Sequence, residues 1–126
     1  MRNQHVSLNR AQALLLWHRV NLGSVLASGP DLSARQMAIL TTVYMDAGPH
    51  TVRSLAQRLG ITISPVTRAL DTLGRYGLVD RGPDPADKRS VLVRRTAQGS
   101  RYLSGFAERI RGEAQSLNIP KPSQVA

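Results

Sequence analysis

The stretch TVRSLAQRLGITISPVTRALDTLGRYG, residues 51–77, decides the fold. Its first half predicts a short helix, because Thr51 offers a capping hydroxyl and Gly60 is a glycine of the kind that ends helices. The apolar residues between these two have helical spacing: Val52, Leu55, Ala56 and Leu59.

A second helix is predicted a few residues later. Ser64 places a capping hydroxyl before Pro65, whose missing N–H costs nothing at the first helical position, and Gly77 ends the segment. The expected buried stripe consists of Val66, Ala69, Leu70 and Leu73. The outward residues are polar and partly basic: Thr67, Arg68, Asp71, Thr72 and Arg75. Two short helices joined by a tight turn, the second with a polar outer face, predict a helix-turn-helix.

The residues that follow predict a β-hairpin with a charged tip. Residues 78–81 and 91–94 are strand-like, and residues 82–89 between them hold two prolines and four charged side chains. The expected fold is therefore mainly α with a small β-hairpin, arranged as a winged helix-turn-helix core over residues 32–96.

Further helices are predicted on both sides of the helix-turn-helix. Helical spacing of apolar residues predicts a first helix over residues 6–28. Ser33 and Gln36 form a capping box for a second helix, which should end near Gly48 and Pro49. Thr96 caps a last helix.

The last helix is expected over residues 97–117, and residues 118–126, which contain two prolines, as a disordered tail. We expect residues 1–126 to form a single domain. The first and last helices carry more apolar residues than a small core can cover, so we expect them to be dimerisation helices. These residues are Leu14, Leu15, Trp17, Val20 and Leu22 in the first helix, and Leu103, Phe106, Ile110 and Leu117 in the last.

The charge of the chain points to a polyanionic partner. Seventeen basic residues against eight acidic ones give a net charge of +9. Between residues 51 and 101 there are ten basic and four acidic residues, so most of the excess lies in the predicted helix-turn-helix and hairpin.

The composition also excludes several classes of protein. With no cysteine, there is no disulfide, thiolate metal site or cysteine nucleophile. His5, His18 and His50 lack ligand-like spacing, and no catalytic triad order or phosphate-binding loop stands out, so we expect no metal, no cofactor and no enzyme. The longest apolar run, residues 13–17, is too short for a membrane span or a signal peptide, and we expect a cytoplasmic protein with no membrane partner.

The order of these elements resembles that of the MarR family, the multiple antibiotic resistance regulators, from about Leu32 to Leu103. The most specific string is DPADKRS at residues 84–90, which is similar to the wing of that family. Other strings that agree are SARQ at 33–36, LAQRLG at 55–60, SPVTRALDTL at 64–73, VLV at 91–93 and TAQG at 96–99. The resemblance implies a dimeric transcriptional regulator that binds DNA.

Three features depart from the family pattern. Arg95 stands where the family usually has an apolar residue, which leaves the packing of that strand open. The helical pattern stops near Leu117, giving one C-terminal helix where the family commonly has two, so we expect a reduced or differently built dimer interface. The lack of cysteine excludes the peroxide-sensing branch of the family.

The predicted recognition helix offers five residues to the major groove: Ser64, Pro65, Thr67, Arg68 and Thr72. Arg68 is the best candidate for a base contact, because a guanidinium can donate two hydrogen bonds to guanine. Considered alone, this surface could equally be a solvated helix face.

In the predicted wing, Lys88 and Arg89 lie at the tip, where a cation can enter the narrow minor groove. The resemblance implies that Asp87 holds the Arg89 side chain in position, and an exposed ion pair of little consequence is the alternative. Candidate phosphate contacts are Arg53, Arg75 and Arg94.

Together, these features predict a homodimeric, sequence-specific regulator that binds double-stranded DNA. Its two recognition helices would lie ~34–36 Å apart and contact an inverted repeat. The alternatives are a winged-helix protein-interaction module and a sequence-indifferent architectural DNA binder. Trp17, His18 and Tyr44 could line a pocket for a small-molecule effector of unknown identity, but a tryptophan in an apolar stripe is more often core, and we expect core.

Overall fold

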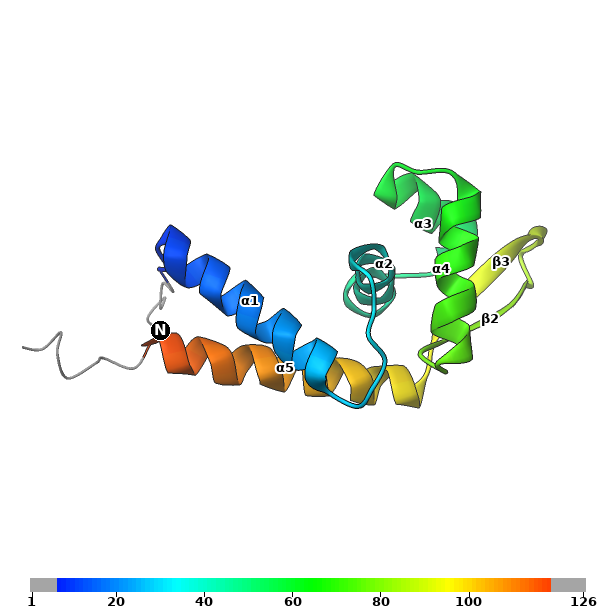
Figure 1. Cartoon of the computed structure of the whole chain (residues 1–126). Coiled ribbons are helices and arrows are strands. Elements are labelled where there is room, and N and C mark those ends of the chain that lie inside the picture. Colours follow the sequence, from blue (N-terminus) through cyan, green and yellow to red (C-terminus); the bar gives the residue numbers. More distant parts are fainter. Residues whose placement is uncertain (1–6, 119–126) are drawn as a thin grey trace, which may run out of the picture. The chain divides into compact units, whose positions relative to one another are not determined.

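The computed structural model describes residues 7–118, which form five helices and three strands (Figure 1). In chain order these are α1 (Arg10–Leu26), α2 (Ala34–Met45), β1 (His50–Thr51), α3 (Val52–Leu59), α4 (Ile63–Arg75), β2 (Val79–Asp84), β3 (Asp87–Arg95) and α5 (Ala97–Asn118). The expected mainly helical fold with a winged helix-turn-helix is confirmed. Apart from residue 118, the predicted tail lies outside the described residues. No helix in the described range combines the length and the apolar character needed to cross a membrane.

The chain divides into two compact units. The core unit is residues 30–104, and the terminal unit comprises the described residues on either side of it, 7–29 and 105–118. The boundary at residue 104 falls inside α5, so the first turns of this helix belong to the core unit. The assignment of residues 97–117 to a dimerisation helix stays a prediction.

The core unit is built around an apolar cluster contributed by three helices and the sheet. The predicted buried stripe of α4 is confirmed in full, since Val66, Ala69, Leu70 and Leu73 are all buried. The rest of the cluster consists of Ile39, Leu40, Val43, Leu55, Ala56, Leu78, Val79 and Val93. Burial of these side chains fixes α4 against α2 and α3 and leaves its polar face outside.

The hairpin belongs to a three-stranded antiparallel sheet with strand order β1-β3-β2. The sequence predicted only two strands, because β1 has two residues and is too short to show alternation. His50 pairs with Val93, and Thr51 with Leu92. Thr51 therefore serves both as the last residue of β1 and as the N-cap of α3.

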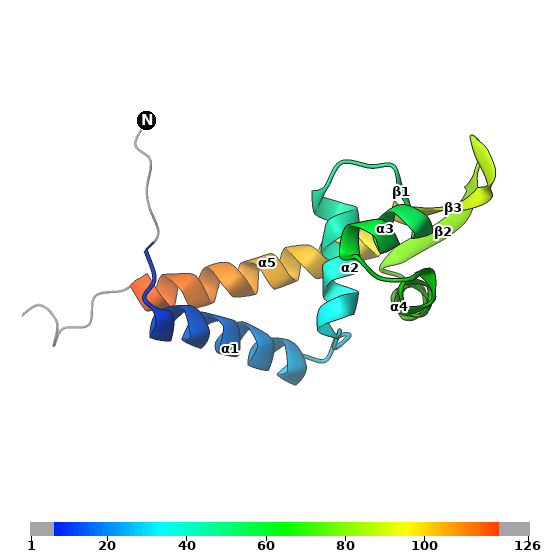
Figure 2. The same ribbon diagram turned by 90° about the horizontal axis from the view of Figure 1, so that it is seen from above.

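The wing is longer than predicted and its loop is shorter. Pairing of β2 with β3 continues from Val79 to Asp84, so the expected loop over residues 82–89 is wrong. Only Pro85 and Ala86 form the turn, and the Ala86 N–H donates to the Asp84 carboxylate at 2.9 Å. A proline in the ladder had favoured a loop, but β2 is an edge strand, where proline is tolerated. The hairpin tip projects past α4 (Figures 1 and 2).

The predicted capping box of α2 is confirmed: Gln36 N–H donates to Ser33 Oγ at 3.1 Å, and Ser33 N–H donates to Gln36 Oε1 at 2.9 Å. The predicted cap of α4 is wrong. This helix begins at Ile63, after Thr62, and Ser64 lies inside its first turn. Pro65 is then the third helical residue, and its missing N–H is harmless there because the first N–H groups of a helix have no intrahelical acceptor.

The bounds of α1 and α2 also differ from the prediction by a few residues. α1 begins at Arg10 rather than at residue 6, because Asn9 and Gln12 form a capping box there. α2 ends at Met45, three residues before the predicted Gly48.

One tyrosine connects α2 to both ends of the hairpin. The Tyr44 hydroxyl lies 2.7 Å from the Leu78 carbonyl and 3.1 Å from the Thr96 carbonyl, and it accepts from the Thr96 N–H at 2.9 Å. Leu78 directly precedes β2, and Thr96 directly follows β3. The predicted Thr96 cap is also present, since Thr96 Oγ1 accepts from the Gly99 N–H at 2.9 Å.

Gly99 is required by this cluster. A Cβ at this position would overlap the Tyr44 hydroxyl and the Leu78 carbonyl. The first turn of α5 can approach Tyr44 this closely only without a side chain at residue 99.

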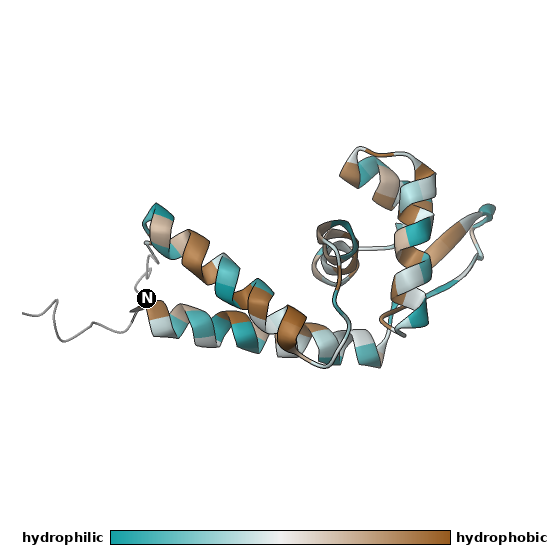
Figure 3. Ribbon diagram, viewed as in Figure 1, coloured by the Kyte–Doolittle hydropathy of each residue, from teal (hydrophilic) through white to brown (hydrophobic). Residues whose placement is uncertain are grey.

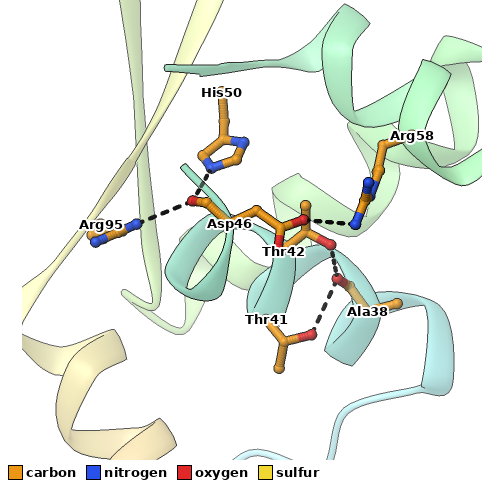
Figure 4. Close-up of polar contacts among 7 residues, drawn as sticks. All are labelled: Ala38, Thr41, Thr42, Asp46, His50, Arg58 and Arg95. Carbon is orange, nitrogen blue, oxygen red and sulfur yellow. Dashed lines mark hydrogen bonds and ion pairs between the residues drawn. The ribbon is translucent and has the colours of Figure 1, made fainter. Parts of the chain in front are cut away.

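The C-terminus of α2 explains why an arginine stands at residue 95 (Figure 4). Arg95 Nε donates to the Val43 carbonyl at 2.8 Å, and its terminal nitrogen lies 3.3 Å from the Asp46 carbonyl. His50 Nε2 lies 3.0 Å from that same carbonyl. The Arg95 guanidinium also stands 5.9 Å from the centre of the Tyr44 ring. Arg95 thus supplies donors to carbonyls that lack intrahelical partners and places a cation where the helix dipole favours one.

In the terminal unit, α1 and the second part of α5 approach each other at Gly23. A Cβ on Gly23 would lie 2.9 Å from Arg109 Cδ, so the aliphatic part of Arg109 packs against the α1 backbone. Val20 is buried, whereas Trp17 is 67% exposed and Leu14 is 69% exposed. The expectation that Trp17 is core is therefore wrong for the single chain. Figure 3 shows apolar residues repeated along α1.

Replacing Tyr44 with phenylalanine should destabilise the core unit. The change leaves the Thr96 N–H and the Leu78 carbonyl without their partner, and we expect a loss of about 1–3 kcal/mol in the free energy of unfolding. Urea denaturation followed by circular dichroism measures it. Tyr76→Phe is the matched control, because the Tyr76 side chain is exposed and its hydroxyl has no hydrogen bond to the described residues. Equal stability of the two variants would contradict the role assigned to Tyr44.

Candidate nucleic-acid interface

The exposed surface of α4 has two sides. Ile63 and Thr67 face a groove shared with α3 and the wing, whereas Pro65, Arg68 and Thr72 face α2. Of the predicted major-groove residues, Ser64 and Arg68 are exposed, and Pro65, Thr67 and Thr72 are half-buried. The predicted outward face of α4 is therefore open, but its residues are divided between two neighbouring surfaces.

The wing side of α4 borders a groove of about 580 Å³. Arg53 and Gln57 reach it from α3, Thr67 from α4, and Arg81 and Arg89 from the wing. Three elements that are separate in the sequence thus place polar and basic side chains around one open groove. A surface of this kind can hold the backbone of a polyanion, because guanidinium groups bind phosphate oxygens.

The tip of the wing is ordered by Asp87. Its carboxylate accepts from the Arg89 backbone N–H at 3.0 Å, and the same oxygen lies 3.8 Å from Arg89 Nε. The Arg89 side chain is 93% exposed. The Asp87–Arg89 pairing implied by the resemblance is thus present in geometry, and Lys88 between them is exposed as well. That these residues contact DNA remains a prediction.

An ion pair that the sequence did not predict joins α4 to the wing. The Arg81 guanidinium donates to the Asp71 carboxylate at 2.7 Å, from β2 to the recognition helix. Asp71 was expected only to face outward, and ten residues separate the pair, so no periodic pattern could connect them. The pair fixes the wing relative to α4 and fills part of Arg81's hydrogen-bonding capacity.

Arg94 lies apart from the other predicted site residues. Its guanidinium pairs with Asp80 at 3.0 Å across the β2–β3 ladder, where the two residues are directly opposite. Side chains alternate along a strand, and the neighbouring pair, Arg81 with Val93, points to α4 and the core. Arg94 and Asp80 therefore occupy the other face of the sheet. The phosphate contact of Arg94 stays a prediction, and Arg94 is not among the residues that line the groove.

The remaining basic candidates lie on the helices. Arg53 is exposed at the start of α3 and has no ion pair within residues 7–118. Arg75 is exposed at the end of α4, and its guanidinium donates to Thr72 Oγ1 at 3.2 Å. Thr72 Oγ1 itself lies 3.4 Å from the Arg68 carbonyl. In the free protein, Thr72 thus orients Arg75 along the outer face of α4.

The three residues considered for an effector pocket do not gather in one unit of the described chain. His18 and Trp17 are exposed in the terminal unit, and the Tyr44 hydroxyl is engaged in the core unit. Within residues 7–118, no three His, Asp or Glu side chains converge as metal ligands would.

Comparison with known proteins identifies relatives of this chain. A sequence profile of the MarR family matches residues 32–91. The multiple antibiotic resistance protein MarR of Escherichia coli is 32% identical over 98 residues, which cover 78% of this chain and 67% of that protein. The HTH-type transcriptional regulator YkoM of Bacillus subtilis, itself uncharacterised, is 37% identical over 68 residues, or 54% of this chain and 44% of that protein.

Among solved structures, the transcriptional regulator Tm0710 from Thermotoga maritima matches with a TM-score of 0.71 at 23% identity, covering 92% of this chain and 80% of that one. The two proteins share the fold. The chain spans about half the length of most of the curated relatives that it matches.

Proposed function

The chain belongs to the MarR family, and we propose that it is a homodimeric, sequence-specific DNA-binding regulator of a prokaryotic cytoplasm. In this function α4 enters the major groove and the β2–β3 wing enters the adjacent minor groove.

The observation that carries the proposal is the groove between α3, α4 and the wing. Arg53, Thr67 and Arg89 face it from three different elements. The buried stripe of α4 holds this helix in place without using its outer face, so that face remains free for base edges. Arg89, which is almost fully exposed at the end of a projecting hairpin, has the position required for a cation in a minor groove.

The roles of the individual residues follow from their positions. Arg68, exposed on α4 and without an ion pair within residues 7–118, is assigned a base contact, with Ser64, Pro65 and Thr67 near it on the same helix. Arg53 is assigned a phosphate contact. Asp87 holds Arg89 and does not itself contact DNA, because a carboxylate near phosphates is repelled.

The terminal unit supports the homodimer. Leu14, Trp17, Leu22, Val25 and Leu26 on α1 are exposed, and Ile110 on α5 is 39% exposed. An exposed apolar surface of this extent is typical of a protein interface. A second copy of the chain is the partner that also gives two recognition helices, as an inverted repeat requires.

The proposal is tested by measuring DNA affinity as a function of salt. We expect binding to a duplex selected from a random pool to weaken by ~10³-fold or more between about 50 and 200 mM salt, and to survive competition by unrelated DNA. Arg89→Ala should lower this affinity and leave the unfolding free energy within about 0.5 kcal/mol of the parent, because Arg89 contacts no core residue.

Other outcomes would favour the other functions. Binding that unrelated DNA competes away equally indicates an architectural DNA binder, and absence of salt-dependent binding indicates a protein-interaction module. Unchanged affinity of Arg89→Ala would overturn the minor-groove role of the wing.

Arg68 and Arg53 should have distinguishable effects. Arg68→Ala should relax the preference at one base position per half-site, at a cost of ~1–3 kcal/mol for the preferred base. Arg53→Ala should weaken binding to all sequences alike, because phosphates carry no sequence information. Selection from a random duplex pool with each variant gives the two preference profiles. If both retain the profile of the parent, Arg68 contacts only the backbone.

Two charge substitutions test the homodimer. Leu14→Asp and Ile110→Asp each place a carboxylate on the exposed apolar surface of the terminal unit, and we expect both to shift the protein from dimer to monomer and to weaken DNA binding. Analytical ultracentrifugation at micromolar concentration measures the mass. A parent protein that is already monomeric, or variants with the parent's mass and affinity, would rule out this interface.

A further inference from the structure

The side of α4 that faces away from the wing contains a second, smaller basic hollow. It has a volume of about 240 Å³ and lies between the first turn of α2 and the outer face of α4. Arg35 lines it from α2, and Arg68 and Thr72 line it from α4. The residues that line it include two arginines and no acidic side chain, so this surface is cationic and separate from the groove at the wing.

No acidic side chain of the described residues stabilises the positive charge of Arg35. Arg35 is the second residue of α2, it is exposed, and it forms no ion pair within residues 7–118. A cation in the first turn of a helix is unfavourable, because the N-terminal end of the helix dipole is positive, and this turn contains no acidic residue to offset it.

An anion bound in the hollow would offset the unfavourable electrostatic energy of the Arg35 guanidinium. The Arg35 and Arg68 guanidinium groups face the same hollow and repel each other in the free protein, and a phosphate beside Arg35 offsets that repulsion and accepts hydrogen bonds from Arg35.

DNA docked on α4 provides phosphates at this place. The major groove is ~12 Å wide, and a helix with its side chains is ~10–12 Å in diameter. A recognition helix therefore fills the groove, and the two sugar-phosphate backbones pass on either side of it. The α3 and wing side of α4 carries Arg53 and Arg89 for one backbone, while the α2 side carries Arg35 for the other.

We propose that Arg35 binds a DNA backbone phosphate on the side of α4 opposite the wing, so that cations flank the recognition helix on both sides. The proposal rests on the proposed DNA-binding function and adds to it a contact outside the helix-turn-helix and the wing. Arg35 would contribute affinity and fix the depth of α4 in the groove, but no base preference.

The experiment measures the salt dependence of DNA affinity for Arg35→Ala and Arg35→Lys. The probes are a duplex selected from a random pool by the parent protein and a duplex of scrambled sequence. For Arg35→Ala we expect both affinities to fall by a similar factor, about 3–10-fold per Arg35 at 0.15 M salt, and the slope of log K against log salt to decrease by about 0.9 per Arg35. Arg35→Lys should restore most of the affinity and the slope, since a phosphate accepts either cation.

Arg58→Ala is the matched control. Arg58 is also an exposed helical arginine of the core unit, but it pairs with Asp46 at 2.9 Å and lines a different hollow, at the other end of α2. Its removal should leave the slope unchanged. Unfolding of Arg35→Ala by urea should occur at the same or slightly higher concentration than in the parent, because the variant loses an unfavourable cation at the start of α2.

Each contrary result has a distinct meaning. Parent-like affinity and slope for Arg35→Ala overturn the phosphate contact and leave the proposed function intact. A loss limited to one base position and not rescued by lysine overturns it in favour of a base contact. If the loss of DNA affinity in Arg35→Ala is accompanied by unfolding at a lower urea concentration, the phosphate contact is overturned in favour of a structural role. If the parent itself shows no salt-dependent DNA binding, the proposed function fails and this contact fails with it.

Discussion

The placement of the wing depends on the hydroxyl group of Tyr44. This hydroxyl accepts from the Thr96 N–H and lies within hydrogen-bond distance of the Leu78 and Thr96 carbonyls. These residues are the first ones outside the hairpin at either end, so one side chain from α2 holds both strands where they enter and leave the sheet. A hydroxyl has one proton, and the shorter distance makes the Leu78 carbonyl its main acceptor. Gly99 allows the close approach, because any Cβ there would overlap this cluster.

Arg95 extends this arrangement to the end of α2. It directly precedes Thr96, and its guanidinium reaches the Val43 and Asp46 carbonyls beside the Tyr44 ring. An apolar residue at this position would contribute packing alone, whereas arginine also satisfies carbonyls that the helix leaves open. The arginine at residue 95 therefore adds hydrogen bonds to the contact between β3 and α2, at the place where an apolar residue would only pack. The wing, α2 and the start of α5 are joined at one point, and the outer face of α4 takes no part in it.

The sequence predicted those features that repeat with a regular period or carry a local capping signal. The buried stripe of α4, the capping box of α2 and the Thr51 cap of α3 are local in this sense, and they are confirmed. The cap of α4 was predicted at Ser64, but the helix begins after Thr62. Strand β1 could not be predicted, because two residues show no alternation and its partner, Val93, is far away in the chain. The exposure of Trp17 was missed for another reason: an apolar stripe looks the same whether the chain or a partner covers it.

Ion pairs, rather than the total charge, determine which cations of the core unit are free to bind the proposed partner, DNA. The sequence gives ten basic residues between positions 51 and 101, but acidic partners hold Arg58, Arg81 and Arg94 at 2.7–3.0 Å. An arginine in such a pair must give up its carboxylate, or keep it beside a phosphate, before it can bind DNA, and either choice reduces the gain. Arg53 and Arg68 have no ion pair in residues 7–118, so neither has to give up a carboxylate in order to bind a phosphate or a base. Because Asp71 neutralises Arg81 and Asp80 neutralises Arg94, the arginines without an ion pair are concentrated on the helices, and the nearly fully exposed Arg89 lies at the wing tip. The placement of a few aspartates thus confines the unpaired positive charge of the core unit to particular surfaces.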